Sequence, residues 1–220
     1  MTSIDTSLST RDRLVAAALA VLEREGPAAI QARTLAGAIG ASTMAVYTQF
    51  GGMPKLIEAV MNEGFARFAE HVRRVPHTDD PVADLMAEGL AYGDFAMQNP
   101  QLYRLLFGLT DLGQIHKRSA EAATPWDLTE AVDALSVPVS AVERAIEAGR
   151  IRPQDPASAA TQILSATHGF VLLAMSGLID PQGPQDVMAR LAINLMVGLG
   201  DTRRRAEHSL AAAIEARASQ

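Results

Sequence analysis

The residues whose types and spacing suggest chemistry gather in residues 32–51, ARTLAGAIGASTMAVYTQFG. If a helix spans about 43–50, Val46 and Phe50 lie on its inner face. Its outer face then carries polar or long side chains: Thr43, Met44, Tyr47 and Thr48. Such side chains can reach base edges and phosphates in a DNA groove. The pattern therefore predicts a DNA-reading helix, and the alternative is three packed helices without a DNA function.

A helix-turn-helix would position these side chains, and the spacing meets its steric requirements. Ala36 is small where the second helix crosses close to it, and Gly40 can take the positive φ of a three-residue turn. Val46 packs back between the helices, and Ser42 can cap the second one. We therefore expect short helices over about 32–39 and 43–50.

Three stretches resemble the DNA-binding head of the TetR (tetracycline-repressor-like) family of transcriptional regulators: RDRLVAAALAVLEREG, QARTLAGAIG and ASTMAVYTQFGGMPKLIEAV. The family shows a Ser before its recognition helix and a Tyr and Phe three residues apart at its end, here Ser42, Tyr47 and Phe50. The resemblance covers about residues 10–65. It implies a double-stranded DNA operator as partner, with phosphate contacts and base contacts divided between two sets of residues. By this resemblance, phosphates are contacted by Arg33, Ser42 and Tyr47, and bases by Thr43, Met44 and Thr48.

The chain departs from the family at the start of the fourth helix, where a Lys is common and Met53 stands here. Lys55 follows two residues later, and we expect it to contact phosphate from there. Alternatively, the backbone amides of Gly52 and Met53 make this contact at a helix N-terminus. Arg11 and Arg13 are further candidates for phosphate contact, or else a solvated helix start.

The C-terminal half carries a second resemblance, in GRIRPQDPASAATQILSATHGFVLLAMSG and NPQLYRLLF. Both are similar to a TetR subgroup marked by a His-Gly pair, here His168-Gly169. That subgroup often has a Trp just before the pair, where this chain has Leu164 and Ser165. The resemblance implies a cavity for a small-molecule effector in the middle helices, and Met and aromatic side chains suit an adaptable lining. Residues of these types are more often plain core than pocket lining. The candidates are Phe95, Tyr103, Phe107, Trp126, His168 and Met175.

A homodimer is also expected. By resemblance, helices over about 156–178 and 184–199 pack against their copies in a second subunit. Gly169 and Gly177 permit close helix approach, although a buried monomer core would need the same residue types. A dimer also suits a helix-turn-helix, which reads two half-sites about one DNA turn apart.

The fold class predicted from periodicity is all-α, because Ala is abundant and no stretch alternates as a half-buried strand would. Pro138 lies inside one expected helix, which we expect to kink or split near Ser136, with Ser136 capping a second piece. The expected longer helices span about 10–25, 54–75, 81–98, 100–107, 125–148, 156–178, 184–199 and 201–216.

The stretch VPHTDDP, residues 75–81, combines two prolines with turn-forming residues and predicts a domain joint. We expect a flexible tail over 1–9, a DNA-binding domain over 10–75 and a ligand-binding and dimerisation domain over 76–220. Residues 1–60 carry five basic and five acidic groups, whereas residues 61–220 carry 14 and 20. This asymmetry fits a DNA-reading head on an acidic body, and it also fits two arbitrary helical subdomains.

Composition excludes several classes of function. The 220 residues have a net charge of −6 and no cysteine, so disulfides, thiolate catalysis and Cys-ligated metals are excluded. The histidines show no metal-binding spacing, and no nucleophile elbow or phosphate-binding loop is present. The longest late apolar run, 170–179, is half of the ~20 residues that span a bilayer. We expect a soluble, cytoplasmic protein that is not an enzyme and has no cofactor, no metal and no membrane partner.

The combined prediction is a ligand-responsive repressor that acts as a homodimer on a palindromic operator. Two alternatives remain: an effector-independent regulator or activator, and a helical binding or scaffold protein with a degenerate DNA-binding head. The departure at Met53 makes the second of these conceivable.

Overall fold

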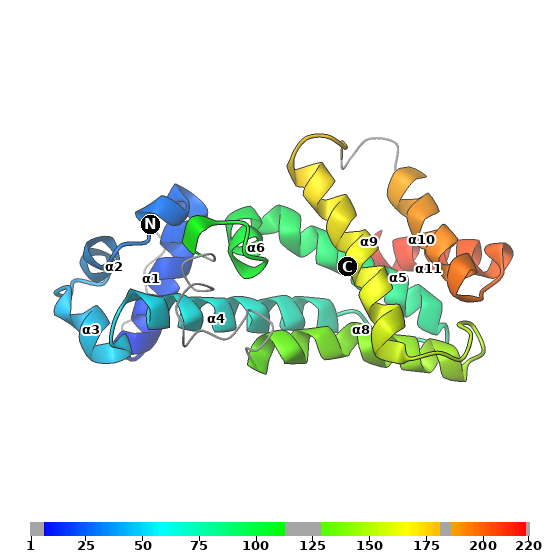
Figure 1. The fold of residues 1–220 in the computed structure, drawn as a ribbon, viewed down its shortest axis with the longest axis horizontal. Coiled ribbons are helices and arrows are strands. Elements are labelled where there is room, and N and C mark those ends of the chain that lie inside the picture. The colour runs from blue at the N-terminus through cyan, green and yellow to red at the C-terminus, as the bar shows by residue number, and fades with distance from the viewer. Residues whose placement is uncertain (1–6, 113–128, 181–185, 219–220) are drawn as a thin grey trace. The chain divides into compact units, whose positions relative to one another are not determined.

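The computed structural model describes residues 7–112, 129–180 and 186–218. These residues form helices and no strands, which confirms the all-α fold (Figure 1). The helices in chain order are α1 (Thr10–Glu25), the 3-10 helix η1 (Pro27–Ala29), α2 (Ala32–Ala38), α3 (Met44–Phe50), α4 (Met53–Arg73), α5 (Pro81–Gln98), α6 (Pro100–Leu106), α8 (Thr129–Glu147), α9 (Pro156–Met175), α10 (Asp186–Leu199) and α11 (Arg203–Ala218).

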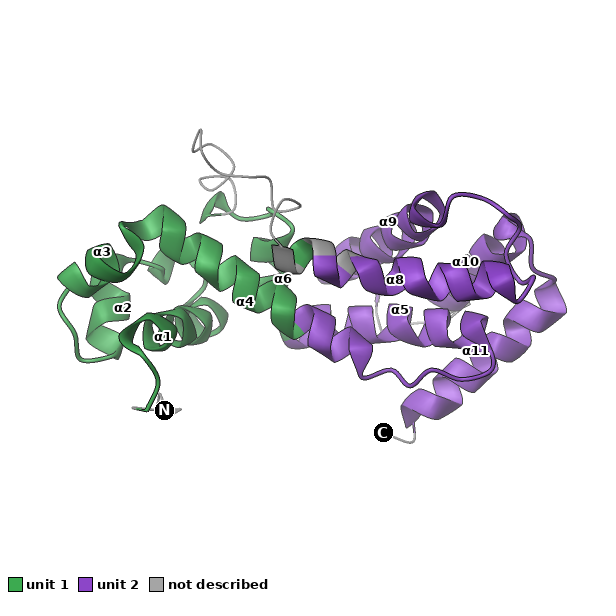
Figure 2. Cartoon of the chain, turned by 90° about the horizontal axis from the view of Figure 1, so that it is seen from below, with its two compact units in different colours: residues 1–67, 99–132 green, residues 68–98, 133–220 purple. Residues whose placement is uncertain are grey.

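The chain divides into two compact units that interleave along the sequence (Figure 2). Unit 1 holds residues 1–67 and 99–132, and unit 2 holds residues 68–98 and 133–220. The chain returns to unit 1 at α6 because that helix packs against α1. The expected domains, 10–75 and 76–220, divide the chain at a single point, whereas the two compact units interleave. The expected boundary stays a prediction.

Local capping signals explain several helix starts. Asp155 caps α9 by accepting a hydrogen bond of 2.8 Å from the Ser158 N–H, and Asp80 caps α5 by accepting from the N–H groups of Val82 and Ala83. In both places the capping Asp directly precedes a Pro in the first turn of the helix. Asn99 precedes Pro100 in the same way at the start of α6, but its side chain makes no cap bond.

The expected split at Pro138 is wrong, because α8 continues through it from Thr129 to Glu147. Ser136 does not cap a second helix, since its hydroxyl donates to the Asp133 carbonyl of the same helix at 2.6 Å. Beyond the proline, Val142 and Ala145 are fully buried in the core of unit 2. Packing of this face therefore keeps the helix intact despite the hydrogen bond that the proline removes.

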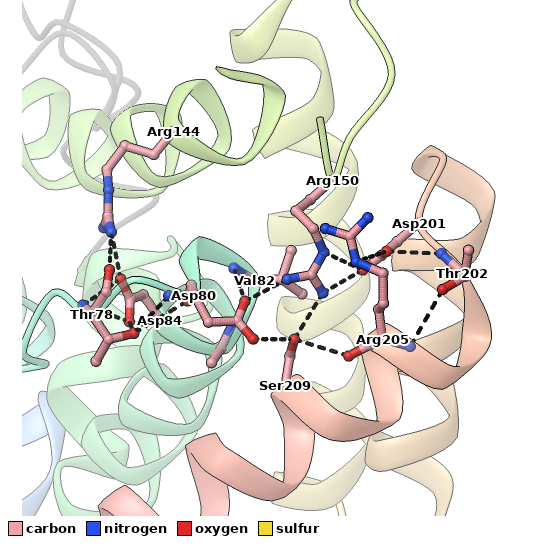
Figure 3. A network of polar contacts seen from close by, with 11 residues as sticks. Thr78, Asp80, Val82, Asp84, Arg144, Arg150, Asp201, Thr202, Arg205 and Ser209 are labelled. Carbon is pink, nitrogen blue, oxygen red and sulfur yellow. Dashed lines mark hydrogen bonds and ion pairs between the residues drawn. The ribbon is translucent and has the colours of Figure 1, made fainter. Parts of the chain in front are cut away.

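A buried guanidinium joins three segments of unit 2 (Figure 3). Arg150, just after α8, contacts Asp80 at 2.6 Å and Asp201 at 2.6 Å, and its Nη2 donates to Ser209 at 2.8 Å. The Asp201 side chain is 0% exposed and that of Arg150 7%. Burial alone would lower the pKa of Arg150, but the two carboxylates outweigh it and raise this pKa above its ordinary value.

Replacing Arg150 tests this junction. Arg150→Ala leaves the buried Asp201 carboxylate without its guanidinium, so we expect the free energy of unfolding to fall by about 3–5 kcal/mol. Urea unfolding followed by circular dichroism measures the change. Arg204→Ala on α11 is the control, because Arg204 is exposed and should change the stability by less than about 0.5 kcal/mol. Equal effects of the two substitutions would contradict the assigned role of Arg150.

Candidate nucleic-acid interface and body cavity

Helices α2 and α3 form a helix-turn-helix in unit 1. Leu35 and Val46 are fully buried, and Ala36 is 1% exposed, as the predicted close packing requires. Gly40 has a φ of 68°, in the left-handed region that the turn was expected to use. The Ala41 N–H donates to the Ala36 carbonyl at 2.8 Å and closes the turn.

The start of α3 differs from the expectation. The helix begins at Met44 after Thr43, and no side chain caps it, so the predicted cap by Ser42 is wrong. Backbone bonds form the first turn instead, with the carbonyls of Ser42 and Thr43 accepting from Ala45 and Val46. The Ser42 side chain is exposed.

All of the residues predicted to contact DNA on this motif have exposed side chains. Met44 is 63% exposed and Tyr47 53%, although both are large and substantially apolar. The other exposed members of this set are Arg33, Ser42, Thr43 and Thr48. Val46 and Phe50 anchor the opposite face of α3. The arrangement leaves the outer face of α3 available for contact, and the individual DNA contacts stay predictions.

Lys55 lies two residues into α4 and is exposed. Its ammonium group pairs with Glu58 at 2.9 Å on the same helix. An exposed pair of this kind is worth at most about 1 kcal/mol, so a phosphate could compete for the lysine.

Arg11 and Arg13 both contact the helix-turn-helix. Arg13 donates from Nη2 to the Ile39 carbonyl at the end of α2, at 2.6 Å. The Arg11 guanidinium lies 4.5 Å from the centre of the Phe50 ring, a cation–π arrangement. These contacts link α1 to α2 and α3. Arg11 is still exposed and Arg13 is half-buried, and their phosphate contacts stay predictions.

The predicted effector-lining residues fall into both units. Tyr103 and Phe107 lie in unit 1, where their ring centres are 4.7 Å apart. Phe95, His168 and Met175 lie in unit 2, and Trp126 lies outside the described residues. None of the five described residues lines the cavities reported below. Their part in ligand binding stays a prediction.

His168 on α9 already has a partner within unit 2. Its Nδ1 lies 2.8 Å from the Tyr92 hydroxyl. The Tyr92 ring in turn packs edge-on against Phe68, with ring centres 5.2 Å apart. Burial lowers the pKa of His168 below its ordinary value.

A largely apolar cavity of about 50 Å³ lies in unit 2 among α4, α5, α8 and α9. Its lining includes Phe68, Tyr92, Pro138, Ile163 and one carboxylic acid, Glu88. Glu88 is 5% exposed, and its Oε2 atom has no hydrogen-bond partner. Burial, reinforced by the nearby Asp84 and opposed by Arg144, raises the pKa of Glu88 to about 8. The acid is therefore mostly protonated at neutral pH.

A larger cleft of about 550 Å³ lies among the end of α4, α5 and α11. Its charged lining is mixed, with Asp80, Asp84 and Asp94 beside His71, Arg74 and Arg217. Asp94 pairs with Arg217 across this cleft. No group of acidic or histidine residues suited to a metal ion occurs in the described part of the chain.

Sequence reasoning did not single out Glu88. Asp84 and Glu88 are four residues apart on a helix, the spacing of an ordinary solvated face. In the structure this part of α5 is buried, and Leu85 and Met86 between the two acids belong to the core. The strongly apolar surroundings of the pair were the available signal.

Comparison with known proteins identifies the family. Residues 85–197 match the family model described as tetracyclin repressor-like, C-terminal domain. The chain therefore belongs to the TetR family, as the sequence resemblance predicted. Members of this family are transcriptional regulators rather than enzymes, so the chain is a DNA-binding regulator by fold and family. The His-Gly subgroup stays a prediction.

Solved structures with the same fold support this assignment. A protein of unknown function from Rhodococcus sp. RHA1 is 26% identical, with a TM-score of 0.75 over 88% of this chain and 97% of its own. A regulatory protein of the tetR family from Rhodococcus RHA1 is 22% identical, with a TM-score of 0.61 over 89% of this chain and 99% of its own.

RolR, solved in complex with resorcinol, is 15% identical, with a TM-score of 0.66 over 91% of this chain and 92% of its own. None of the curated proteins matches the chain significantly.

One described helix, α9, is long and apolar enough to cross a membrane by length and composition alone. The apolar run 170–179 covers only part of this helix. The rest of α9 contains scattered polar residues but no Asp, Glu, Lys or Arg, so its mean hydropathy stays high. A core helix passes the same test, so this is weak evidence for a membrane span.

Glu88 should make the stability depend on pH. Because the folded pKa of about 8 lies above the ordinary 4.5, its contribution is complete below pH 4.5 and is lost as the pH rises to about 8. We expect the stability of Glu88→Gln relative to the parent protein to rise between pH 5 and pH 8, by on the order of a few kcal/mol. Urea unfolding at each pH measures it. Glu143→Gln, an exposed change on α8, is the control. A pH-independent difference for Glu88→Gln would show that the acid is ionised in the folded protein.

Proposed function

We propose that the chain is a ligand-responsive repressor that binds a palindromic operator as a homodimer. The exposed outer face of α3 carries this proposal, because Met44 and Tyr47 are exposed on a helix whose inner face is firmly packed. Met44 and Tyr47 are three residues apart and therefore adjoin on the helix surface. A contiguous exposed apolar patch marks an interaction surface.

The proposed contacts are of two kinds: phosphate contacts that position the protein on the DNA and base contacts that recognise the sequence. Arg33, Ser42 and Tyr47 contact phosphates and fix the register, whereas Thr43, Met44 and Thr48 face the bases. On DNA binding, the Lys55 ammonium would leave Glu58 and contact a phosphate, because an exposed ion pair contributes little free energy.

Dimerisation would use α9 and α10. Large apolar side chains are exposed on or just after these helices: Leu173, Leu178, Val187 and Val197. Only 33% of the apolar window of α9 is buried within the chain, which leaves surface for a second copy. Met196 on α10 is only 2% exposed in the core of the unit, so it is not available to a second copy.

The ligand response would be a population shift. A small molecule that binds one body conformation better than another changes the separation of the two DNA-binding heads only through that difference in affinity. RolR, which shares the fold, is known in complex with a small phenol. A cytoplasmic location follows from this role.

An effector-independent regulator is the second candidate. The apolar cavity of about 50 Å³ is small beside ordinary ligand pockets of roughly 300–1,000 Å³, and the cleft of about 550 Å³ has a mixed charged lining rather than a predominantly apolar one. Such a regulator would bind the same operator, and no metabolite would release it.

Selection of bound sequences from a random duplex pool tests the proposal. We expect a palindromic winner that two chains bind, with an affinity that falls steeply as salt increases. A pool without enrichment would leave a helical binding protein with a degenerate head. An asymmetric winner bound by one chain would contradict the dimer.

Tyr47→Ala should weaken binding to the selected operator. Loss of a phosphate contact should cost about 1.5–3 kcal/mol per subunit, measured by fluorescence anisotropy. Sedimentation should show the same oligomeric state as the parent protein. Ile214→Ala on α11, which removes a similarly exposed side chain from unit 2, should leave operator affinity unchanged. Parent-like affinity of Tyr47→Ala would remove this residue from the interface.

A further inference from the structure

The small cavity of unit 2 contains a carboxyl group that no hydrogen-bond donor in the described part of the chain fully satisfies. Asp84 and Glu88 lie one turn apart on α5, and Arg144 reaches them from α8. Arg144 pairs with Asp84 at 2.8 Å, and Asp84 also accepts bonds from the backbone and hydroxyl of Thr78. The Arg144 guanidinium therefore pairs with Asp84 and not with Glu88, and Glu88 Oε2 has no hydrogen-bond partner.

The same cavity wall offers a second acceptor. Pro138 has no N–H, so the carbonyl of Ala134, four residues earlier in α8, lacks its ordinary helical hydrogen bond. Ala134 and Pro138 both line the cavity with Glu88. Pro138 thus leaves the Ala134 carbonyl without its helical N–H donor, on the helix that lines the cavity together with Glu88.

The remaining lining is largely apolar and partly aromatic, with one hydroxyl residue, Thr167. Phe68 and Tyr92 contribute rings, and Leu85, Ile163 and Leu164 contribute aliphatic surface. Aromatic faces attract cations, particularly where water is excluded.

The nearby guanidinium of Arg144 uses Nη2 for Asp84 and the Thr78 carbonyl, and its Nη1 makes no hydrogen bond to Glu88. The unpaired acceptors and the rings are therefore complementary to a positive charge on an apolar body.

We propose that this cavity binds a small organic cation, an ammonium group with a short apolar substituent, and that Glu88 is its counter-ion. This inference rests on the ligand response proposed above and specifies the chemical class of the effector. The ammonium group would donate to the Glu88 carboxylate, and its substituent would lie against the rings and aliphatic side chains.

The size of the cavity limits the substituent. A second cavity, of about 30 Å³, shares Leu85, Gly89, Ile163 and Thr167 with the first. Movement of these shared side chains would join the two spaces, which fits a substituent of a few carbons.

Binding of the cation should expel a proton from Glu88. Asp84, Arg144, Tyr92 and His168 are the titratable groups around it, from α5, α8 and α9. Arg144 is committed to Asp84, and His168 is mostly neutral at pH 7 because burial lowers its pKa. Glu88, whose pKa is about 8, is therefore the group that titrates on binding.

The test compares isobutylammonium with isobutanol, which has a similar shape and no charge, by NMR titration of the full chain. We expect the amine to bind the parent protein, with an affinity that rises ~10-fold per pH unit between pH 6 and pH 7 as Glu88 gives up its proton. Glu88→Gln should weaken amine binding at least ~10-fold at pH 8 and remove this pH dependence, because the amide keeps the volume but not the charge.

Two controls keep the result interpretable. Asp94→Asn changes an acid on the same helix that lines the larger cleft, and it should leave amine binding unchanged. The carboxyl ¹³C signals of the parent protein provide a measurement that needs no variant: saturating amine at pH 7 should convert one buried glutamate from the protonated to the ionised form.

Several results would overturn the inference. Tighter binding of isobutanol than of the amine would make this a site for neutral ligands. Amine binding that survives Glu88→Gln would place the cation elsewhere, and loss in Asp94→Asn would assign it to the larger cleft.

Operator affinity measured with the same samples separates this inference from the proposed function. Glu88-dependent amine binding without an effect on operator affinity would support the cation site and contradict the ligand response. If isobutanol released the operator from both the parent protein and Glu88→Gln, the result would support the ligand response and overturn the cation site.

Discussion

The contact of Arg150 with Asp80 and Asp201 is the constraint on which the body of this regulator depends. Asp80 has two tasks, since one carboxylate oxygen caps α5 and also accepts from Arg150. Burial alone would raise its pKa, but the hydrogen bonds from Ser209 and the Ala83 N–H and the charge of Arg150 lower it. The start of α5 is thereby tied to the segment after α8 and to α11. This fixes the helix that carries Asp84, Glu88 and Tyr92.

Among the described residues of unit 2, every buried carboxyl except one has a cationic partner. The buried carboxyls among the described residues are Asp84, Glu88 and Asp201. Asp201 is paired with Arg150, and Asp84 with Arg144 and Thr78. Burying an unpaired ionised carboxylate would cost far more free energy than protonating it. Glu88 therefore retains its proton, which leaves a buried group whose charge can respond to a bound molecule.

Local signals account for what the sequence predicted well. The bounds of α5, Pro81–Gln98, match the expectation because the Asp-Pro pair defines its start. Gly40, Val46 and Phe50 behave as their spacing required, since a helix-turn-helix is determined by contacts between neighbouring residues in the sequence. The same short-range logic was insufficient at Pro138, where the packing of distant helices keeps α8 continuous.

The features that sequence reasoning missed depend on distant partners. Arg150 contacts residues 51 to 70 positions away, and Arg13 contacts a carbonyl 26 positions away. Periodicity places such residues on a helix face, but it does not specify what lies opposite. Glu88 is harder still, because what distinguishes it is the lack of a partner within a buried environment. Only the assembled core reveals that property.

The most direct test of this account is the titration of the Glu88 carboxyl in the unliganded protein, followed by ¹³C NMR and assigned with Glu88→Gln. The account predicts a midpoint at about pH 8, because burial and Asp84 together outweigh Arg144. A midpoint at or below the ordinary 4.5 would contradict it. Glu88 would then be ionised in the folded protein and held by a counter-ion, for which the unpartnered Nη1 of Arg144 is the available group.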